Sequence, residues 1–388
     1  MTSALQDLLE RHVASGTVPG VVASLGTAEL KIVAAGAMSV GGAPMPADAI
    51  MRIQSMTKAV TTVAALRLVE AGRLRLDEPV ERWLPELADR QVLKSPTAEL
   101  ADTSPAVRAI TLRHLLTNTS GYGMVLTECP LQRAMADSET EAGVGPVTLG
   151  AEEWLARLAA LPLAFQPGEG WRYHHSFGIL GILIARVAGR PLQDQLADDL
   201  LGPLGLRDTG LWVSAGSVAR LPASYRHTDS GLVELEPAAG GFYAGHPPFD
   251  VSHAELVSTV RDYTRFARML ADGGRFEGRQ IVSEEHLRLM TSDQVPAIAK
   301  TPDSFFPGFW DGTGWGFGVG VDTEGGRAGR YGWSGGLGTN FFVDPDGTVG
   351  VLLTQVEMGE RMQLLLDEFQ VLPEAARRSK TSTRQLSP

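Results

Sequence analysis

The stretch SMTK places Ser55 and Lys58 three residues apart at the start of an apolar segment. Residues at this spacing lie about one turn apart on one helix face, where a lysine amine can hydrogen-bond a serine hydroxyl. Burial would lower the pKa of the lysine and let its amine share in removing the serine proton. The alternative is structural: Ser55 caps the helix and Lys58 extends along its surface. The spacing alone leaves both interpretations open.

A second serine competes for the role of nucleophile. Ser334 is the centre of GWSGG, residues 332–336, which matches the G-x-S-x-G elbow of α/β-hydrolases. That elbow needs a helix after the serine and a histidine later in the chain. Here a predicted pair of strands follows, and the last histidine in the sequence is His286. Chain order therefore argues against Ser334 as the nucleophile.

Tyr173 is the candidate for a further acid–base group. It lies in PGEGWRYHH, residues 167–175, at a predicted turn before a helix. A tyrosine close to a cationic lysine would have its phenolate stabilised. It could then serve as the general base for Ser55 and return the proton to the leaving alcohol. A tyrosine packed in the core is the alternative interpretation.

The elements that must position these residues follow from hydrophobic periodicity and turn signals. A helix over residues 56–71 carries Ser55 and Lys58 at its start, because apolar residues recur there at helical spacing up to Gly72. Two further helices are expected, one at the N-terminus and one after the cap Thr111. Four more are expected over residues 150–161, 176–189, 254–272 and 359–370. Strands are expected over residues 20–26 and 30–39, joined by the turn TAE, and over residues 314–322, 329–336 and 340–355, with Asp346 and Gly347 in a hairpin turn.

Strands at both chain ends with helices between them predict one sheet assembled from the two termini. We expect an α/β lobe from residues 1–78 and 255–372 and an inserted helical lobe over residues 79–254. Within that insertion, residues 118–150 have no clear period, which is typical of a lid over a pocket or of a mobile loop. Residues 373–388 are expected to form a flexible tail.

The composition limits the kinds of partner that the protein is expected to bind. The chain has 388 residues, of which 44% are hydrophobic, and a net charge of −11, which disfavours binding to nucleic acid or an anionic membrane. Cys129 is the only cysteine, and no H-E-x-x-H pattern occurs, so we expect no disulfide and no metal site. The N-terminal residues lack a signal-peptide pattern, and no apolar run is long enough to span a membrane. A cytoplasmic enzyme for a small molecule is therefore expected, while the oligomeric state is not predicted.

Four motifs stand in a recognisable order: SMTK, LLTNTSG at residues 115–121, FQPGEGWRY at residues 165–173, and WSGG at residues 333–336. Together they resemble the serine β-lactamase and penicillin-binding-protein superfamily, and most closely the class C β-lactamase-like branch that includes family VIII carboxylesterases. The resemblance covers roughly residues 8–370. It implies a mixed α/β (α+β) fold of two lobes, an antiparallel sheet flanked by helices plus an inserted mainly helical lobe, with the site in the cleft between them.

The resemblance also implies roles for individual residues. Ser55 would be the acylated nucleophile, Lys58 its activating partner and Tyr173 the base. The oxyanion hole would consist of the backbone N–H groups of Ser55 and Gly336. With these roles we expect a serine hydrolase that uses no metal or organic cofactor.

Three departures from the family pattern bear on the substrate. His175 replaces an asparagine that orients the substrate and the lysine, and its charge would depend on pH. Trp333, Ser334 and Gly335 replace a Lys/His-Thr-Gly triplet, so the cation that binds a substrate carboxylate is lost. The segment PPFDVSHAELVST, residues 247–259, replaces a glycine-rich run.

The predicted substrate contacts are therefore His175, Trp333, Ser334 and Gly335, together with two aromatic residues. Phe249 is expected to wall the pocket along with its neighbours Phe242, Tyr243 and His246, although packing in the core or a loop would also explain these aromatics. Tyr122 follows LLTNTSG directly and is also expected at the pocket. His114 is expected to be structural.

These observations predict a serine carboxylesterase that hydrolyses short-chain or bulky neutral esters through an acyl-enzyme on Ser55, with acyl transfer to other nucleophiles as a further outcome. The alternatives are a β-lactamase or D-amino-acid-specific peptidase of the same fold, or a non-catalytic binding protein. The loss of the cation at position 333 favours the esterase.

Overall fold

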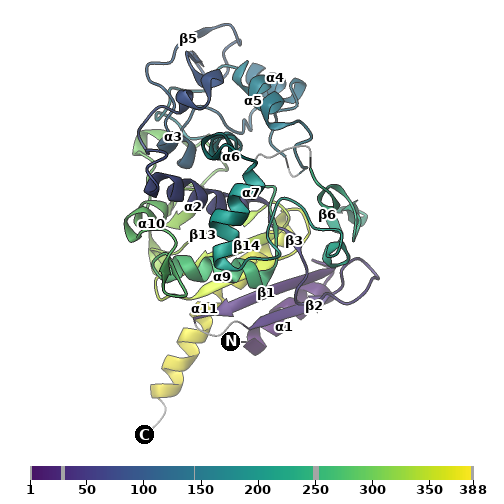
Figure 1. Ribbon diagram of the computed structural model, residues 1–388. Helices are drawn as coiled ribbons and strands as arrows, with labels where there is room; N and C mark the ends of the chain where they lie inside the picture. The colour runs from purple at the N-terminus through teal and green to yellow at the C-terminus, as the bar shows by residue number, and fades with distance from the viewer. Residues whose placement is uncertain (1, 28–30, 144, 248–252, 386–388) are drawn as a thin grey trace.

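The centre of the protein is a seven-stranded antiparallel sheet. A computed structural model describes residues 2–27, 31–143, 145–247 and 253–385, with side chains described to residue 374. The strand order is β11-β12-β13-β14-β15-β1-β2, so strands from both ends of the chain lie side by side (Figure 1). Their bounds are β1 Gly20–Gly26, β2 Ile32–Gly36, β11 Thr313–Trp315, β12 Gly320–Asp322, β13 Tyr331–Gly335, β14 Thr339–Val343 and β15 Val349–Leu353.

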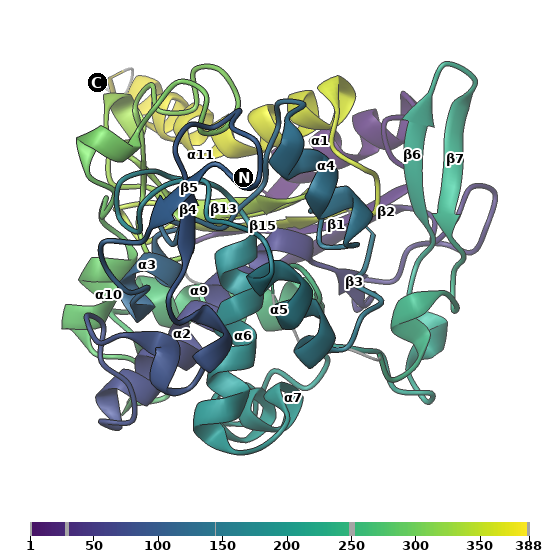
Figure 2. The same ribbon diagram turned by 90° about the horizontal axis from the view of Figure 1, so that it is seen from above.

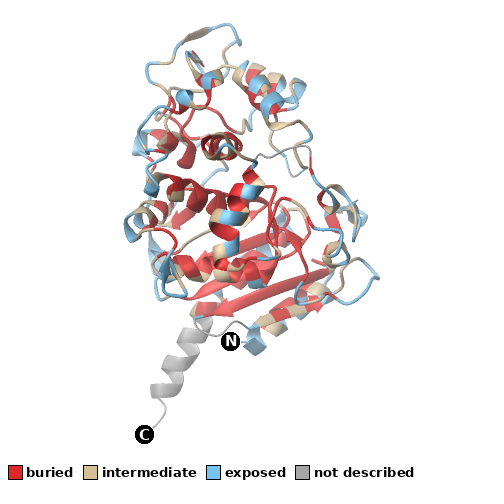
Figure 3. Cartoon of the chain, in the orientation of Figure 1, coloured by how far each residue is buried: buried red, intermediate tan, exposed pale blue. Residues whose placement is uncertain are grey.

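Helices cover both faces of this sheet. On one face, α1 (Thr2–Ala14) and α11 (Glu360–Gln385) contact each other, and α1 also packs on β1 and β2. Leu5, Leu8 and Leu9 of α1 recur at helical spacing and pack in one cluster with Phe342 and Phe369. On the other face, α9 (Val260–Ala271) packs on β1, β14 and β15. The sheet interior is consequently buried on both sides (Figure 3).

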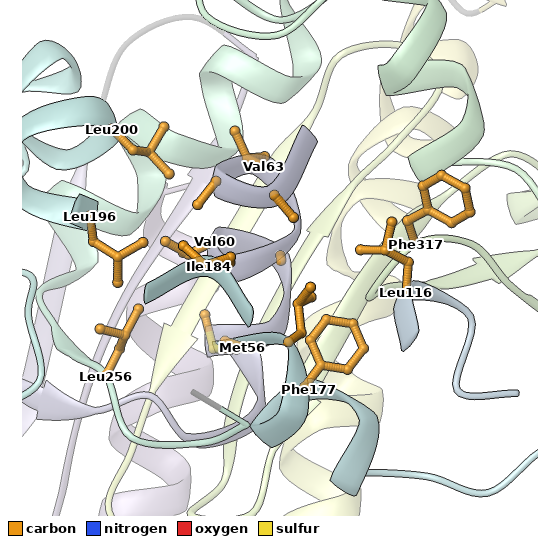
Figure 4. Close-up of a cluster of buried hydrophobic side chains, with 14 of the residues drawn as sticks. Met56, Val60, Val63, Leu116, Phe177, Ile184, Leu196, Leu200, Leu256 and Phe317 are labelled. Atoms are coloured by element: carbon orange, nitrogen blue, oxygen red, sulfur yellow. The ribbon is translucent and has the colours of Figure 1, made fainter. Parts of the chain in front are cut away.

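A second layer, formed around α2 (Thr57–Glu70) and α6 (His175–Ala188), lies above α9. Almost every residue of α2 up to Leu68 is buried, as in a helix packed on all sides rather than on one stripe. Val60 and Val63 of α2 lie with Phe177 and Ile184 of α6 in one apolar cluster (Figure 4). The start of α2 is therefore held deep inside the molecule.

The remaining elements are short and lie between β2 and β11 in the sequence. In Figure 1, α4 and α5 lie above α2 and α6, and α3 lies beside α6, while Figure 2 shows the β6–β7 hairpin projecting to one side. The helices are α3 Leu112–Leu116, α4 Pro130–Asp137, α5 Ala151–Ala159, α7 Leu192–Leu196, α8 Gly202–Leu204 and α10 Glu284–Met290. The paired strands are β3 Met51–Arg52 with β8 Val257–Ser258, β4 Gln91–Leu93 with β5 Thr103–Pro105, β6 Ser224–Thr228 with β7 Gly231–Glu236, and β9 Arg275–Phe276 with β10 Arg279–Gln280.

The mixed fold and the sheet built from both termini are confirmed. The β14–β15 hairpin turns at Gly347, which has a φ of 79° that favours glycine, as the Asp346-Gly347 pair predicted. The turn TAE between β1 and β2 lies partly outside the described residues. The division into lobes at residues 78 and 255 and the flexibility of residues 373–388 stay predictions.

Four expected elements differ from the structure. The stretch 118–150 contains α4, because Leu131 and Met135, four residues apart, bury one face of a short helix. The helix expected over 254–272 begins at Val260, because the Thr259 hydroxyl accepts a hydrogen bond from the Asp262 N–H and residues 257–258 pair with β3. Residues 314–322 form parts of two strands rather than one. The last helix continues beyond residue 370 to Gln385, past Pro373, which the sequence pattern did not predict.

Candidate active site

Ser55 lies where the backbone turns into helix α2. It belongs to the 3₁₀ turn η1, Gln54–Met56, which leads directly into Thr57. Gln54 has a φ of 51°, a left-handed conformation that is uncommon for a residue with a side chain and is often found at functional sites. Because Ser55 precedes the first turn of a helix, the free N–H groups and the helix dipole favour negative charge beside it.

Strand β13 closely approaches this turn because Gly335 has no side chain. A Cβ at Gly335 would lie 2.5 Å from the Ile53 carbonyl oxygen and 2.9 Å from the Gln54 Cβ. On its far side β13 pairs with β14 as far as Gly335, whereas the described pairing with β12 ends at Gly332. The strand edge next to Ser55 is therefore open to a ligand from Trp333 onward.

Lys58 is completely buried directly behind Ser55. Its Nζ donates hydrogen bonds to Ser55 Oγ at 3.1 Å and to the His253 carbonyl oxygen at 2.5 Å. The same Nζ lies 4.5 Å from the centre of the Tyr173 ring. Burial lowers the pKa of Lys58 to about 7, and the charge of Glu255 acts in the opposite direction. A neutral amine, able to accept a proton, is thus available near neutral pH.

Tyr173 lies just before α6 and presents its hydroxyl to Ser55. The hydroxyl accepts a hydrogen bond from the Trp333 indole N–H at 2.5 Å and shares another with the Ser55 side chain. Burial raises the pKa of Tyr173 above its usual range, and these two hydrogen bonds only partly oppose that rise. The expected stabilised phenolate is therefore not favoured in the resting site, where Tyr173 keeps its proton.

A cavity of about 690 Å³ opens onto these groups. The predicted residues that it brings together are Ser55, Tyr173, Trp333, Ser334, Gly335 and Gly336, and Lys58 lies behind Ser55. Sequence reasoning missed much of the apolar part of the wall, which consists of Met124, Phe305, Phe306 and Phe309. The last three come from the dense aromatic run SFFPGFW, residues 304–310, which was the available signal.

The structure does not bring Tyr122 or His175 to the cavity. Tyr122 is buried in the core with its hydroxyl 3.5 Å from an Arg90 nitrogen, because it follows the LLTNTSG segment inward. The His175 ring stacks on Trp154, and its Nε2 lies 2.7 Å from the Thr140 carbonyl oxygen. Burial lowers the pKa of His175 to about 4, so it is neutral at physiological pH and does not repel Lys58.

Among the described residues of the segment 242–249, the expected aromatic wall of the cavity is also absent. Phe249 lies outside the described residues. Tyr243 and Phe242 pack in a separate apolar cluster, and the His246 ring lies against Trp212. His114 completes a capping box with Thr111, which is a structural role.

The residues that sequence reasoning overlooked most clearly are His253 and Glu255. Both are buried, and they lie in the segment that replaces the family's glycine-rich run. Their signal was a pair of ionisable residues flanking Ala254 in the segment just before the predicted helix. In the described part of the chain, no three His, Cys, Asp or Glu side chains are placed to hold one metal ion.

Comparison with known proteins decides the family. The family model described as Beta-lactamase matches residues 5–366, which is nearly the whole chain. The chain belongs to the β-lactamase family. Its motifs SMTK, LLTNTSG, FQPGEGWRY and WSGG are thus those of a serine hydrolase superfamily, as the sequence predicted.

Curated relatives include characterised and uncharacterised proteins. Protein Rv1367c of Mycobacterium tuberculosis is 36% identical over 315 residues, which cover 78% of this chain and 76% of that protein. Esterase EstB of Burkholderia gladioli is 40% identical over 176 residues, covering 45% of this chain and 41% of EstB. The match to EstB thus spans less than half of either protein.

Solved structures agree over nearly the full length. EstCE1, described as a hydrolase with promiscuous acyltransferase activity, superposes with a TM-score of 0.77 at 26% identity and covers 95% of this chain and 98% of its own. The D-amino acid amidase of Ochrobactrum anthropi has a TM-score of 0.69 at 23% identity, covering 97% of this chain and 99% of its own. The second likeness shows the fold alone.

None of the described helices is both long and apolar enough to cross a membrane.

Proposed function

We propose that this protein is a serine esterase that forms an acyl-enzyme on Ser55 and releases the acyl group to water or to another alcohol. The observation that carries the proposal is the hydrogen bond between Ser55 Oγ and the buried Lys58 amine, whose pKa of about 7 lets it accept the serine proton. Relatives named as esterases and acyltransferases support ester chemistry.

Acylation uses each group in one step. Neutral Lys58 takes the proton of Ser55, and Ser55 Oγ attacks the ester carbonyl carbon. The backbone N–H groups of Ser55 and Gly336, aided by the start of α2, stabilise the oxyanion. When the intermediate collapses, the Tyr173 hydroxyl protonates the leaving alkoxide, and the acyl group stays on Ser55.

Deacylation restores all three groups. The Tyr173 phenolate, now beside an ammonium at Lys58, takes a proton from an incoming water or alcohol, whose oxygen attacks the acyl carbon. Lys58 returns its proton to Ser55 Oγ as the acyl product leaves. The net reaction consumes one water and one ester and releases one acid and one alcohol, so that protons balance within the site.

The lining of the cavity favours a substrate with a neutral and largely apolar acyl or alcohol group. Its wall near Tyr173 consists of Met124, Phe305, Phe309 and Trp333. Its charged lining residues already have ion-pair partners: Asp322 with Arg327, Arg330 with Asp344, and Glu357 with Arg226. A volume of about 690 Å³ fits a bulky ester as well as a short one.

Amide or β-lactam hydrolysis is the second candidate, because a D-amino acid amidase shares the fold and the family model is that of β-lactamases. The same Ser55 would attack the amide carbonyl. Trp333 stands where the resemblance expects a carboxylate-binding cation, which disfavours this candidate. Turnover of a chromogenic cephalosporin and of a D-alanyl peptide, measured beside ester turnover, ranks the two candidates.

The deciding experiment compares the native protein with Ser55→Ala, using Ser334→Ala as a matched control. We expect p-nitrophenyl butyrate hydrolysis that is lost in Ser55→Ala and retained in Ser334→Ala, with circular dichroism showing that all three are folded. A fluorophosphonate should add one covalent mass increment to the native protein and none to Ser55→Ala. Native-level activity in Ser55→Ala would refute the proposal.

A cytoplasmic location is a further proposal. Fractionation of the producing cells, with esterase activity followed in each fraction, tests it.

A further inference from the structure

The amine of Lys58 is held by a backbone carbonyl whose own residue is fixed by a buried pair. Lys58 Nζ donates to the His253 carbonyl oxygen at 2.5 Å. The His253 ring Nε2 lies 3.0 Å from Glu255 Oε1, and the exposed fractions of the two side chains are 6% and 2%. Glu255 Oε2 also accepts a hydrogen bond from the Ala254 N–H at 2.7 Å. The carboxylate therefore ties residues 253–255 into one compact turn beside the amine.

Residues of α5 and α6 and the adjacent His174 enclose the His253 ring. Its centre lies 4.0 Å from that of His174 and 5.8 Å from that of Trp154 in α5. A Cβ at Gly178 of α6 would lie 2.7 Å from His253 Nδ1, so glycine at this position makes room for the ring. His174 itself has a φ of 93°, which brings its ring inward against His253. Such enclosure from two helices leaves the ring little freedom to move.

Glu255 also supplies negative charge to the surroundings of Lys58. Burial disfavours the ammonium form of Lys58, and the negative charge of Glu255 opposes that effect. Without this charge a fully buried lysine would hold its proton still more weakly, and its hydrogen bonds to Ser55 and His253 would lose strength. The proposed mechanism needs an amine that both accepts and returns a proton. It therefore depends on the opposing effects of burial and of the Glu255 charge on the pKa of Lys58.

We propose that His253 and Glu255 form a positioning pair for Lys58: the pair fixes the carbonyl that accepts the lysine hydrogen bond, and its carboxylate stabilises the protonated amine. The functional part rests on the proposed role of Lys58 as the proton acceptor of Ser55. Neither the His253 nor the Glu255 side chain lines the cavity, so both act through Lys58.

Other titratable groups face the pair, and each is accounted for. Burial lowers the pKa of His174 well below its usual value and that of His175 to about 4, so both rings are neutral near pH 7. Burial, aided by the charge of Glu255, raises the pKa of Tyr243, which therefore stays a phenol. Glu236 forms an ion pair with Arg52 at 2.6 Å. Tyr173, on the other side of Lys58, also keeps its proton.

The experiment reads the protonation of Lys58 directly. The chain has five lysines, Lys31, Lys58, Lys94, Lys300 and Lys380, so lysine labelled with ¹³C at Cε gives few NMR signals. Lys58→Arg removes one signal and assigns it. In the native protein we expect this signal to titrate near pH 7. In Glu255→Gln it should titrate about one pH unit lower, because an anion that stabilised the ammonium is gone.

A matched control lies at the other end of the same helix. Glu70 in the last turn of α2 contacts His286 Nδ1 at 2.8 Å, which makes a second Glu–His pair far along α2 from Lys58. Glu70→Gln removes the same charge from the same kind of pair and should leave the Lys58 titration unchanged. A Glu255→Gln titration that coincides with those of the native protein and Glu70→Gln overturns the proposal.

Kinetics supply an independent reading. The acid limb of kcat/KM for p-nitrophenyl butyrate should move with the NMR midpoint in Glu255→Gln and stay in place in Glu70→Gln. If the native protein turns over no ester, the NMR titration still decides the positioning pair, and only the proposed function fails.

Should Glu255→Gln not fold, as judged by circular dichroism, Glu255→Asp decides. Its shorter side chain withdraws the carboxylate from both His253 and Lys58, so we expect a smaller shift of the Lys58 midpoint in the same direction. A native midpoint in a folded Glu255→Asp then overturns the proposal.

Discussion

Ser55 and Ser334 line the same cavity, yet only one of them is placed for nucleophilic chemistry. Ser55 precedes helix α2 and contacts the amine of buried Lys58. Ser334 lies within strand β13, and its hydroxyl accepts a hydrogen bond from the Asn340 side-chain amide at 2.9 Å. An amide nitrogen cannot take a proton from a hydroxyl, whereas a neutral amine can. The difference teaches that the element carrying a serine and the partner behind it decide its reactivity, even where the local motif matches.

The surroundings of the two serines also differ in their effect on the free energy of folding. A pKa that falls from 10.5 to about 7 on burial corresponds to roughly 5 kcal/mol of folding free energy. Because the unfolded chain binds this proton more tightly, the cost is complete below about pH 7 and disappears as the pH rises towards 10.5. The Ser334–Asn340 hydrogen bond carries no such penalty. The proposed role of Ser55 therefore requires a buried lysine that lowers the stability of the fold.

The sharpest way to break the comparison is to remove the amine while keeping its shape. In Lys58→Met we expect kcat for p-nitrophenyl butyrate to fall by about a thousandfold, because Ser55 loses its proton acceptor. The midpoint of thermal unfolding at pH 7 should rise, because the penalty for burying a cation disappears. Calorimetry and steady-state kinetics measure both. Near-native turnover would remove Lys58 from the mechanism, and a lowered midpoint would contradict the energetic argument.

Tyr173→Phe should have the next largest effect. The leaving alkoxide loses its proton donor and the Trp333 indole loses its acceptor, so we expect kcat to fall by about a hundredfold. Tyr122→Phe is the matched control, since it removes a hydroxyl from another buried tyrosine that does not line the cavity. Equal losses in the two variants would show that the effect is one of packing rather than of proton transfer.

The pH dependence sharpens the comparison further. Lys58 accepts a proton only when neutral, so kcat/KM should fall about tenfold per pH unit below its pKa of about 7. His175, whose pKa is lowered to about 4, should add no inflection between pH 5 and 8. Rate profiles of the native protein and Ser334→Ala should share the same acid limb. A profile that is flat from pH 5 to 8 would contradict a neutral Lys58 as the base.

Ser334→Ala should have the smallest effect. The hydroxyl accepts a hydrogen bond from Asn340 and lies at the open strand edge, so we expect a change in kcat/KM within about threefold. Asn340→Ala, which removes the partner instead, should behave alike. Loss of activity comparable to that of Ser55→Ala would mean that the cavity has a second essential serine.

Short-range patterns predicted much of this arrangement. The spacing of Ser55 and Lys58, the apolar period of α2 and the Asp346-Gly347 turn are local features, and the structure keeps the elements that they predicted. The order of four motifs along the chain predicted the family and the meeting of Tyr173, Trp333 and Gly336 in one cavity. Chain order also argued against Ser334 as the nucleophile, and the Ser334→Ala variant tests that prediction.

The sequence by itself determined which residues are the candidates for the chemistry, because residue type and spacing along a helix or in a turn are encoded locally. Only the tertiary structure decided how those residues behave. The pKa of Lys58 depends on burial by α6 and on a carboxylate at Glu255, nearly two hundred positions away in the chain. Tyr122 turned into the core and Phe305 into the cavity for the same reason. Dielectric surroundings and packing partners are assembled from distant segments, so no local pattern contains them.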